Sequence, residues 1–245
     1  LVGSEMCIRD RHCYDRSIAA PADFWAEHAH DLAWFRKPTE ILRDNPDGTH
    51  QWFADGRLNS CYLALDHQIE EGRGDQLALI YDSPVTGNQQ SFTYRQMRDE
   101  VARLAGLLRT LGVKQGDGVV IYMPMVPQAA MAMLACARIG AVHSVVFGGF
   151  APHELALRID DARPTLLLTA SCGLEFDRVI EYKPLVDRAL EQSAHQPRNV
   201  LVLQRPEALA TLQEGRDLDW QAALAGAKPV PPVELRAADP LYIMY

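Results

Sequence analysis

Residues 117–150, with the sequence DGVVIYMPMVPQAAMAMLACARIGAVHSVVFGGF, determine how the rest of the chain is interpreted. The runs 119–122 and 142–147 are short and apolar without alternation, which is typical of strands covered on both faces. Between them, residues 126–139 are apolar on nearly every side, so this segment predicts a buried helix. Gly140 suits a left-handed cap at its end. Two strands joined by one helix predict a right-handed crossover and therefore a parallel sheet.

A glycine pair, Gly148 and Gly149, follows the second strand of this unit. In open parallel sheets, ligands bind beyond the carboxyl ends of the strands. A residue without a side chain lets the backbone approach a ligand there. The alternative interpretation is an ordinary turn between strand and helix. The pair is therefore a candidate site that needs a second observation.

The overall composition is that of an ordinary globular protein. The chain has 245 residues, of which 48% are hydrophobic and 23% charged, enough for one large domain or two small ones. Its formal net charge of −8 argues against a nucleic-acid or anionic-membrane surface, although it permits a local basic pocket for a phosphorylated ligand. No apolar run approaches the roughly 20 residues that a membrane span needs.

The five cysteines are widely spaced and form no Cys-x-x-Cys pair, as expected of free thiols in a reducing compartment, so we predict a cytoplasmic protein. His143 has no second ligand at metal spacing, and we expect it to make a hydrogen bond in the core rather than to bind a metal. No Ser/His/Asp arrangement and no Gly-x-Gly-x-x-Gly motif stands out. The sequence therefore predicts neither a metal site nor a catalytic residue.

The remaining segments continue the alternation of strands and helices. Thr93 and Gln96 form a capping box, which predicts a helix that Gly112 ends. The predicted elements are strands at 77–82, 90–92, 165–169, 199–203 and 241–245, and helices at 21–36 (with Asp23 as N-cap), 59–69, 93–111, 152–162 and 183–194. This order predicts an α/β fold with a doubly wound, mostly parallel sheet and helices on both of its faces.

Three regions are expected along the chain. Residues 1–13 carry no periodicity and are expected to be a non-native or disordered tail. Residues 14–76 predict a small, mostly helical N-terminal appendage, and residues 77–245 predict the main domain. The last apolar run has nothing after its carboxyl end, where phosphate chemistry is normally placed in such sheets. We therefore expect the chain to be truncated before a phosphate-binding loop.

Several segments resemble the N-terminal region of acetyl- and propionyl-CoA synthetases, which belong to the ANL (AMP-binding, adenylate-forming) enzymes. They are FWAE at 24–27, LAWF at 32–35, WFADGRLN at 52–59, YDSP at 81–84, YMPMVP at 122–127 and ACARIGAVHSVVFGGF at 135–150. The resemblance covers residues 14–245. The runs DSPVTG at 82–87 and YKP at 182–184 favour the propionyl type, propionate–CoA ligase.

The resemblance implies the fold of the N-terminal part of an acyl-CoA synthetase and an acid–thiol ligase activity in propionate metabolism. In that reaction, propionate (or acetate) attacks ATP in the presence of Mg²⁺ to give an acyl-adenylate and pyrophosphate. The thiol of CoA then displaces AMP. The lysine-containing phosphate loop of the family lies beyond residue 245, so we expect the fragment itself to be inactive.

The resemblance also implies part of a CoA site. In acetyl-type enzymes a loop with two arginines holds the 3′-phosphate end of CoA, and it aligns with Glu175, Phe176, Asp177 and Arg178. Arg178 matches the second arginine, and a guanidinium group suits a phosphate. Glu175 and Asp177 depart from the pattern, which weakens the expected phosphate binding. The alternative for Arg178 is a solvated loop arginine. Gly148, Gly149 and Phe150 resemble the segment that lines the pantetheine tunnel.

A second class of function is compatible with the same residues. The chain could be a self-sufficient, non-catalytic α/β module that binds a nucleotide or CoA. Both hypotheses predict small-molecule partners and neither nucleic acid nor membrane. Calorimetric titration of the chain with CoA distinguishes the module from an inert fragment.

Overall fold

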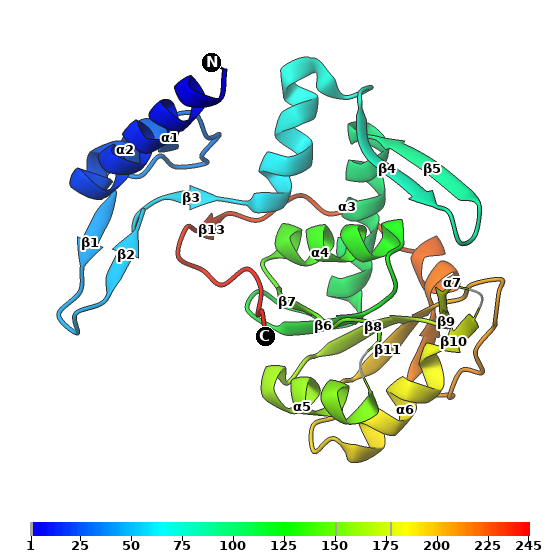
Figure 1. Cartoon of the computed structure of the whole chain (residues 1–245). Helices are drawn as coiled ribbons and strands as arrows, with labels where there is room; N and C mark the ends of the chain where they lie inside the picture. The colour runs from blue at the N-terminus through cyan, green and yellow to red at the C-terminus, as the bar shows by residue number, and fades with distance from the viewer. Residues whose placement is uncertain (1, 150, 177) are drawn as a thin grey trace. The chain divides into compact units, whose positions relative to one another are not determined.

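The computed structural model describes residues 2–149, 151–176 and 178–245 and divides the chain into two compact units. One unit comprises Leu1–Leu58 and Glu234–Asp239, and the other comprises Asn59–Val233 and Pro240–Tyr245. The larger unit contains a central parallel sheet with helices above and below it (Figure 1).

The central sheet has five strands in the order β12-β11-β8-β6-β7, and every adjacent pair is parallel. The strands are β6 (Gly118–Tyr122), β7 (Val142–Val145), β8 (Leu166–Ala170), β11 (Asn199–Leu203) and β12 (Asp217–Asp219). The pairing of β6 with β7 confirms the parallel unit predicted from residues 117–150. The second strand ends at Val145, two residues earlier than the apolar run suggests.

Helices cover both faces of this sheet. One face carries α3 (Tyr94–Thr110), α4 (Pro127–Ile139) and α7 (Trp220–Ala225), and the opposite face carries α5 (Pro152–Ala162) and α6 (Tyr182–Gln192). Along β6, Val119 and Ile121 join the core on the α4 side, whereas Val120 and Tyr122 join the core on the α5–α6 side. Because successive side chains of a strand point to opposite faces, one strand supplies both cores. The predicted doubly wound α/β fold is confirmed.

The helix α3 follows its sequence signals closely. Thr93 accepts a hydrogen bond from the Gln96 backbone, and the Gln96 side chain accepts one from the Thr93 backbone, so the capping box is complete. The predicted apolar stripe is buried at Met97, Val101, Leu104 and Leu108. Gly112 lies at a φ of +93°, a left-handed conformation that stops the helix.

The helix α4 contains a buried cation. Arg138 has a side chain that is 4% exposed and makes two hydrogen bonds to Asp66, at 2.7 and 3.0 Å. Its Nε donates to the Val230 carbonyl at 2.7 Å. After Gly140, which caps the helix at a φ of 74° as predicted, the chain enters β7. The paired guanidinium therefore joins α4 to two segments that are distant in sequence.

The segment before the hairpin is a helix with two π-helical stretches, η1 (Tyr62–Asp66) and η2 (Ile69–Arg73). The Asn59 side chain accepts from the backbone N–H groups of Cys61 and Tyr62 and donates to the carbonyls of Ala137 and Val233. The hairpin is antiparallel, as predicted, and pairs β4 (Leu77–Ser83) with β5 (Asn88–Thr93).

The last five residues do not form the predicted strand. Tyr242 makes a single parallel bridge with His143, in which Leu241 accepts a hydrogen bond from the His143 N–H and Ile243 donates one to its carbonyl. The Tyr245 hydroxyl donates to Asp161 at 2.5 Å. The segment therefore covers part of the β7 edge through one bridge only.

The smaller unit differs most from its sequence prediction. It contains α1 (Val2–Ala19), α2 (Pro21–Ala29), the hairpin β1 (Leu42–Asp44) with β2 (His50–Trp52), and β3 (Arg57–Leu58) paired with β13 (Leu235–Arg236). The helix predicted for 21–36 ends at Ala29. Asp23 is not its N-cap, because the helix begins at Pro21, which needs no hydrogen-bonded N–H, and Ala20 occupies the cap position.

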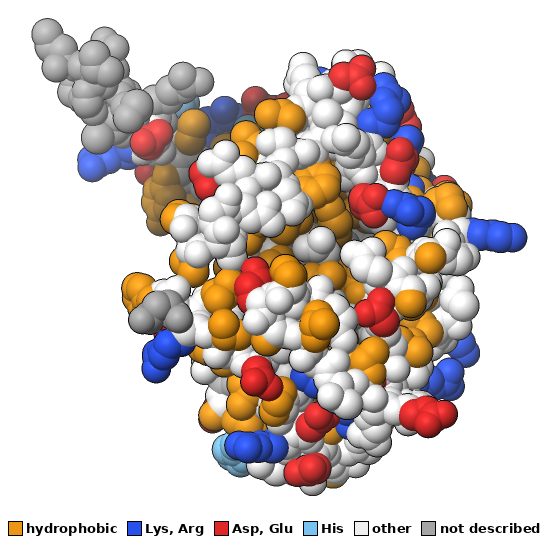
Figure 2. Space-filling view, turned by 90° about the vertical axis from the view of Figure 1, so that its right-hand side faces the viewer, with side chains coloured by type: hydrophobic (Ala, Val, Ile, Leu, Met, Phe, Trp, Pro, Cys, Tyr) orange, Lys and Arg blue, Asp and Glu red, His pale blue; other side chains and the backbone are white. Residues whose placement is uncertain are grey.

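Two further observations concern the surface. In the part of the chain that the structure describes, none of the helices combines the length and the apolar character needed to cross a lipid bilayer. Figure 2 views the molecule from the side where β5 and α7 lie in Figure 1, and acidic and basic side chains are interspersed there with hydrophobic ones.

Candidate functional site

The candidate site lies at the carboxyl edge of the five-stranded sheet. The chain leaves β6 toward α4 on one face, whereas it leaves the neighbouring strands β7 and β8 toward α5 and α6 on the other face. Adjacent strands whose following segments diverge in this way open a crevice, which is where open α/β sheets bind ligands. Tyr122, the last residue of β6, therefore marks the expected ligand position.

The predicted glycine pair lies at this edge, and close packing explains both glycines. A Cβ atom on Gly148 would lie 2.2 Å from the hydroxyl oxygen of Tyr182, and one on Gly149 would lie 2.7 Å from the ring of Phe147. Neither glycine has a positive φ. Aromatic rings therefore occupy the space that side chains would need at these positions. Phe150, the third residue predicted here, lies outside the described residues.

The second predicted segment is the turn of a hairpin between β9 (Cys172–Glu175) and β10 (Arg178–Glu181). Glu175 and Arg178 face each other in the ladder, with a 3.4 Å contact between their charged groups. The Arg178 side chain is 73% exposed, so its guanidinium remains accessible to a phosphate. Phe176 is 83% exposed and has a φ of 54°. Asp177 falls outside the described part of the chain.

Tyr182 brings these two predicted segments together. A Cβ atom on Gly173 in β9 would lie 2.6 Å from the Tyr182 hydroxyl oxygen, so the same oxygen packs against Gly148 and Gly173. The Tyr182 ring lies 5.1 Å from the ring of Tyr122, whose hydroxyl donates to the Gly148 carbonyl at 3.2 Å. Sequence reasoning missed both tyrosines. Their only signal was an aromatic residue at the end of an apolar strand and another after a hairpin.

Burial governs the protonation of this cluster. Desolvation raises the pKa of Tyr122 to about 12 and also raises the pKa of Tyr182. Both phenols are therefore neutral near pH 7 and can donate hydrogen bonds. Arg205 follows β11 and donates from Nη1 to the Cys172 carbonyl at 3.0 Å, which fixes the start of the hairpin.

A network of charges fixes the helix that carries Tyr182. Lys183 is 4% exposed and contacts Asp187 at 2.6 Å and Asp217 at 2.8 Å. Arg216 contacts the same two carboxylates. Burial opposes ionisation of Asp217, but hydrogen bonds from Arg216 and Lys183 outweigh it, so the pKa of Asp217 lies below its ordinary value. The fully buried carboxylate remains charged and paired.

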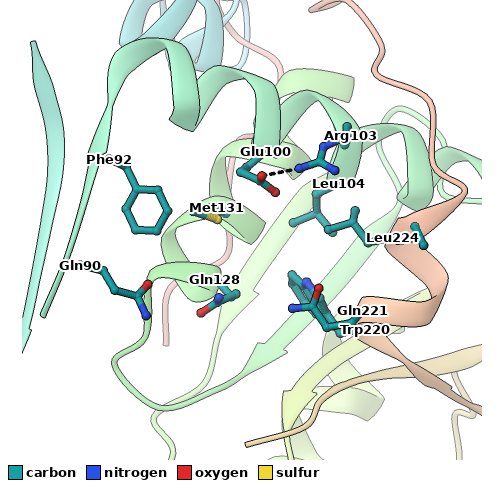
Figure 3. Close-up of a pocket in the computed structure, with 11 residues that line it drawn as sticks. Gln90, Phe92, Glu100, Arg103, Leu104, Gln128, Met131, Trp220, Gln221 and Leu224 are labelled. Carbon is teal, nitrogen blue, oxygen red and sulfur yellow. Dashed lines mark hydrogen bonds and ion pairs between the residues drawn. The ribbon is translucent and has the colours of Figure 1, made fainter. Parts of the chain in front are cut away.

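A separate cavity of about 400 Å³ lies on the α4 face of the sheet (Figure 3). Its inner wall includes the nearly buried side chains Leu104, Met131 and Trp220, and its outer wall carries the Glu100–Arg103 ion pair. The complete lining is Gln90, Phe92, Glu100, Arg103, Leu104, Gln128, Met131, Trp220, Gln221, Leu224 and Ala225. None of the candidate site residues predicted from the sequence lines this cavity.

The remaining titratable candidates show structural rather than chemical roles. Among residues 2–149, 151–176 and 178–245, no group of His, Cys, Asp and Glu side chains is arranged to hold a metal ion. Burial raises the pKa of the Cys136 thiol to about 12, as expected for an inert core cysteine. The expectation for His143 was wrong, because its Nδ1 is buried without a hydrogen-bond partner in this part of the chain.

Comparison with protein families gives two matches along the chain. Residues 65–245 match the AMP-binding enzyme family, and residues 11–64 match the family described as acetyl-coenzyme A synthetase N-terminus. The chain belongs to the AMP-binding enzyme family. The resemblance drawn from the sequence motifs is confirmed at this level.

Individual AMP-binding relatives agree with this assignment. An uncharacterized protein of Pseudomonas aeruginosa is 73% identical over 230 residues, which are 94% of this chain and 37% of the relative. The propionate–CoA ligase of Escherichia coli is 46% identical over 207 residues, covering 84% of this chain and 33% of the relative. The chain therefore spans about a third of the length of the curated relatives it matches.

A solved structure shows the same fold. The acetoacetyl-CoA synthetase from Streptomyces lividans superimposes with a TM-score of 0.83 at 26% sequence identity. The match covers 94% of this chain and 35% of that protein. The arrangement found here thus corresponds to part of a larger AMP-binding enzyme.

Proposed function

We propose that this chain is the N-terminal part of an ATP-dependent short-chain acyl-CoA ligase. The parent would activate a short carboxylate as an acyl-adenylate and transfer the acyl group to CoA, with release of pyrophosphate and then AMP. The AMP-binding match over residues 65–245 carries the proposal. The match over residues 11–64 to an acetyl-coenzyme A synthetase N-terminus supports a short acid.

Within this class, we propose propionate as the acid, with acetate as the runner-up. The DSPVTG and YKP runs favour the propionyl type, and the relative in Escherichia coli is a propionate–CoA ligase. In the structure, the first run forms the turn between β4 and β5 and the second begins α6. Neither run lines the cavity on the α4 face, so they act as family markers rather than as an acid pocket.

The chain would contribute to CoA binding, and we assign it no catalytic residue. The proposed CoA-binding residues are Gly148, Gly149, Phe150, Glu175, Phe176, Asp177 and Arg178. Arg178 would hold a phosphate, because its guanidinium is exposed and its charged contact among the described residues is the 3.4 Å pair with Glu175. ATP and Mg²⁺ supply the phosphoryl chemistry, and we place their main contacts outside this chain. For the regions, we retain a tail at 1–13, an appendage at 14–76 and an AMP-binding domain from 77.

The test uses the full-length protein that carries this chain. Propionate-dependent exchange of labelled pyrophosphate into ATP reports the first half-reaction, and CoA-dependent release of AMP reports the second. We expect both with propionate, weaker rates with acetate, and none from residues 1–245 alone. Absence of exchange with every short acid would refute the ligase. Exchange catalysed by residues 1–245 alone would refute the assignment of the phosphate chemistry to the rest of the protein.

The second candidate is a CoA- or nucleotide-binding module without catalysis, and the 400 Å³ cavity favours it because that volume lies within the range of ligand pockets. Calorimetric titration of residues 1–245 separates the two. Binding of ATP or CoA that a Met131→Trp substitution abolishes would place the ligand in the cavity and support the module. Binding of CoA that is insensitive to this substitution supports the site at the carboxyl edge.

A further inference from the structure

The cavity on the α4 face is not part of the proposed CoA site. Its eleven lining residues come from β5, α3, α4 and α7, and all of them belong to the larger unit. A volume of about 400 Å³ lies near the lower end of the range of small-molecule pockets. The cavity therefore suits a ligand much smaller than CoA.

The inner wall of the cavity is apolar. Leu104, Met131 and Trp220 are each at most 5% exposed. Phe92 of β5 lines the same space from the side (Figure 3). Aromatic rings pack well against such side chains, and a methionine sulfur makes favourable contacts with a ring. The inner wall therefore favours a ligand that contains an aromatic ring.

Three glutamines add hydrogen-bonding groups to this apolar wall. Figure 3 shows Gln90 on one side of the cavity, Gln221 on the other and Gln128 between them in this view. Over residues 2–149, 151–176 and 178–245, the side-chain amides of Gln128 and Gln221 make no hydrogen bond with protein groups. The amide of Gln90 makes one long bond, of 3.5 Å, to Asn88. Because each amide carries donors and acceptors, a ligand with a donor next to an acceptor can pair with them.

The charges of the lining cancel. Of the eleven described residues that line the cavity, Glu100 and Arg103 are the charged ones, and they form an ion pair with each other. An anionic ligand would gain little from a guanidinium that already holds a carboxylate, and the carboxylate would repel it. The lining therefore disfavours phosphates and carboxylates, including the ATP or CoA that the second candidate function would place there.

We propose that this cavity binds an uncharged small molecule in which a carboxamide is attached to an aromatic ring. The ring lies against Met131 and Phe92, and the carboxamide pairs with the side-chain amides of Gln128 and Gln221. The site is separate from the carboxyl edge of the sheet, because none of the proposed CoA-binding residues lines it. The inference goes beyond the proposed ligase function and does not rest on it.

Benzamide and benzoate are matched probes, because they share a ring and differ in the charge of one group. The experiment titrates residues 1–245, labelled with ¹³C at the methionine methyl groups, and follows the Met131 signal by NMR, with Met131→Leu to assign it. Benzamide should shift this signal with a Kd on the order of 1 mM, as expected for a ligand of its size. The signal of the exposed Met244 should not respond. Benzoate should bind roughly tenfold more weakly.

Glutamine variants test the amide contacts. Gln128→Leu keeps a side chain of similar size and removes the amide, so the Kd for benzamide should rise about three- to tenfold, as for the loss of one hydrogen bond. Gln221→Leu should act in the same direction. The control is Gln192→Leu, since Gln192 is exposed at the end of α6 on the opposite face of the sheet. Each substitution removes an amide that has no hydrogen bond to the described residues, so all three melting temperatures should equal that of the wild type.

Several results would overturn the proposal. Equal affinities for benzamide and benzoate, or no saturable shift of the Met131 signal, would do so. An unchanged Kd in both cavity variants, or an equal change in Gln192→Leu, would have the same consequence. A shift of Met131 that ATP or CoA produces at lower concentration than benzamide would assign the cavity to the second candidate function instead. Because these titrations do not measure acid-dependent exchange, a failed ligase assignment leaves their outcome unaffected.

Discussion

The two faces of the central sheet are stabilised in different ways. On the α4 face, one buried cation, Arg138, has its own carboxylate partner, Asp66, and the helices above leave a cavity. On the α5–α6 face, Lys183 shares its carboxylates with Arg216, and glycines at the sheet edge pack against aromatic rings. A cavity therefore marks the face without the predicted site, whereas tight packing marks the face that carries it.

This difference shows that the face of the sheet with a cavity need not be the face with conformationally constrained residues. The cavity is lined by apolar side chains, three glutamines and one ion pair, and its lining contains no residue with a positive φ. At the carboxyl edge, aromatic rings pack against two glycines, and one residue, Phe176, has a positive φ. Groups under such local constraint concentrate at functional sites. The following changes test whether the two faces can be altered independently.

The largest effect is expected on the α4 face from Asp66→Ala. The substitution leaves the Arg138 guanidinium buried beside the Val230 carbonyl and Cys61 without its carboxylate. Loss of one partner of a buried pair costs about 3–5 kcal/mol, which urea denaturation should detect. The matched control is Asp75→Ala, whose pair with Arg95 is exposed and should contribute less than about 1 kcal/mol. Similar losses for both variants would contradict the distinction.

The next effect is expected at the site from Gly148→Ala. The new methyl group would lie 2.2 Å from the Tyr182 hydroxyl, so the loop or the ring must move. Such overpacking costs about 1–3 kcal/mol, measurable by thermal denaturation. Gly226→Ala is the control, because nothing lies within 4 Å of the added atom and its φ is −95°. A Gly148→Ala protein as stable as the Gly226→Ala protein would show that the contact is not restrictive.

Acid should weaken the α5–α6 face through Asp217. Its folded-state pKa lies below the ordinary value of 3.8, so its ionised form contributes stability above that value. This contribution is lost as the pH falls from about 4 through the folded-state pKa. Asp217→Asn should therefore be less stable at pH 7 and should show a shallower decline below pH 4, by up to about 1.4 kcal/mol per pH unit. Parallel decline of the two proteins in pH-dependent urea denaturation would exclude Asp217 as a source.

The smallest effect is a gain in stability from Phe176→Gly. The φ of 54° at Phe176 is unfavourable for a residue with a Cβ and ordinary for glycine. The side chain is 83% exposed, so little packing is lost. The net gain should be about 0.5–1 kcal/mol, and Phe176→Asn should gain less. A destabilised Phe176→Gly protein would indicate that the ring makes a contact that compensates for the backbone strain.

The sheet and its helices could be predicted because local signals and tertiary packing agree there. The β6–α4–β7 unit carries buried runs, a cap and glycines in the expected places, and the strand Asn199–Leu203 has the predicted bounds. The smaller unit could not be read in this way. Its strands are only two or three residues long, and β3 pairs with β13 from the far end of the chain. Periodicity needs more residues than these strands contain.

The candidate site was predictable only in part. Motif resemblance indicated Gly148 and Arg178, but the residue that joins their loops is Tyr182, whose role depends on which loops lie side by side. No spacing rule relates Gly148, Gly173 and Tyr182. The buried pair of Arg138 and Asp66 was hidden for the same reason, since an arginine in an apolar helix gives no sign of its distant partner.

The bridge between His143 and Tyr242 has a consequence for biosynthesis. The β7 edge is synthesised about one hundred residues before the segment that covers it, which at 5–20 residues per second amounts to roughly 5–20 s on the ribosome. Throughout that interval the β7 edge offers unpaired backbone groups to neighbouring nascent chains. Chaperones would therefore contact β7 early, and slow pairing at the sheet edge would affect β7 first. By contrast, β6, β8 and β11 can already pair with one another.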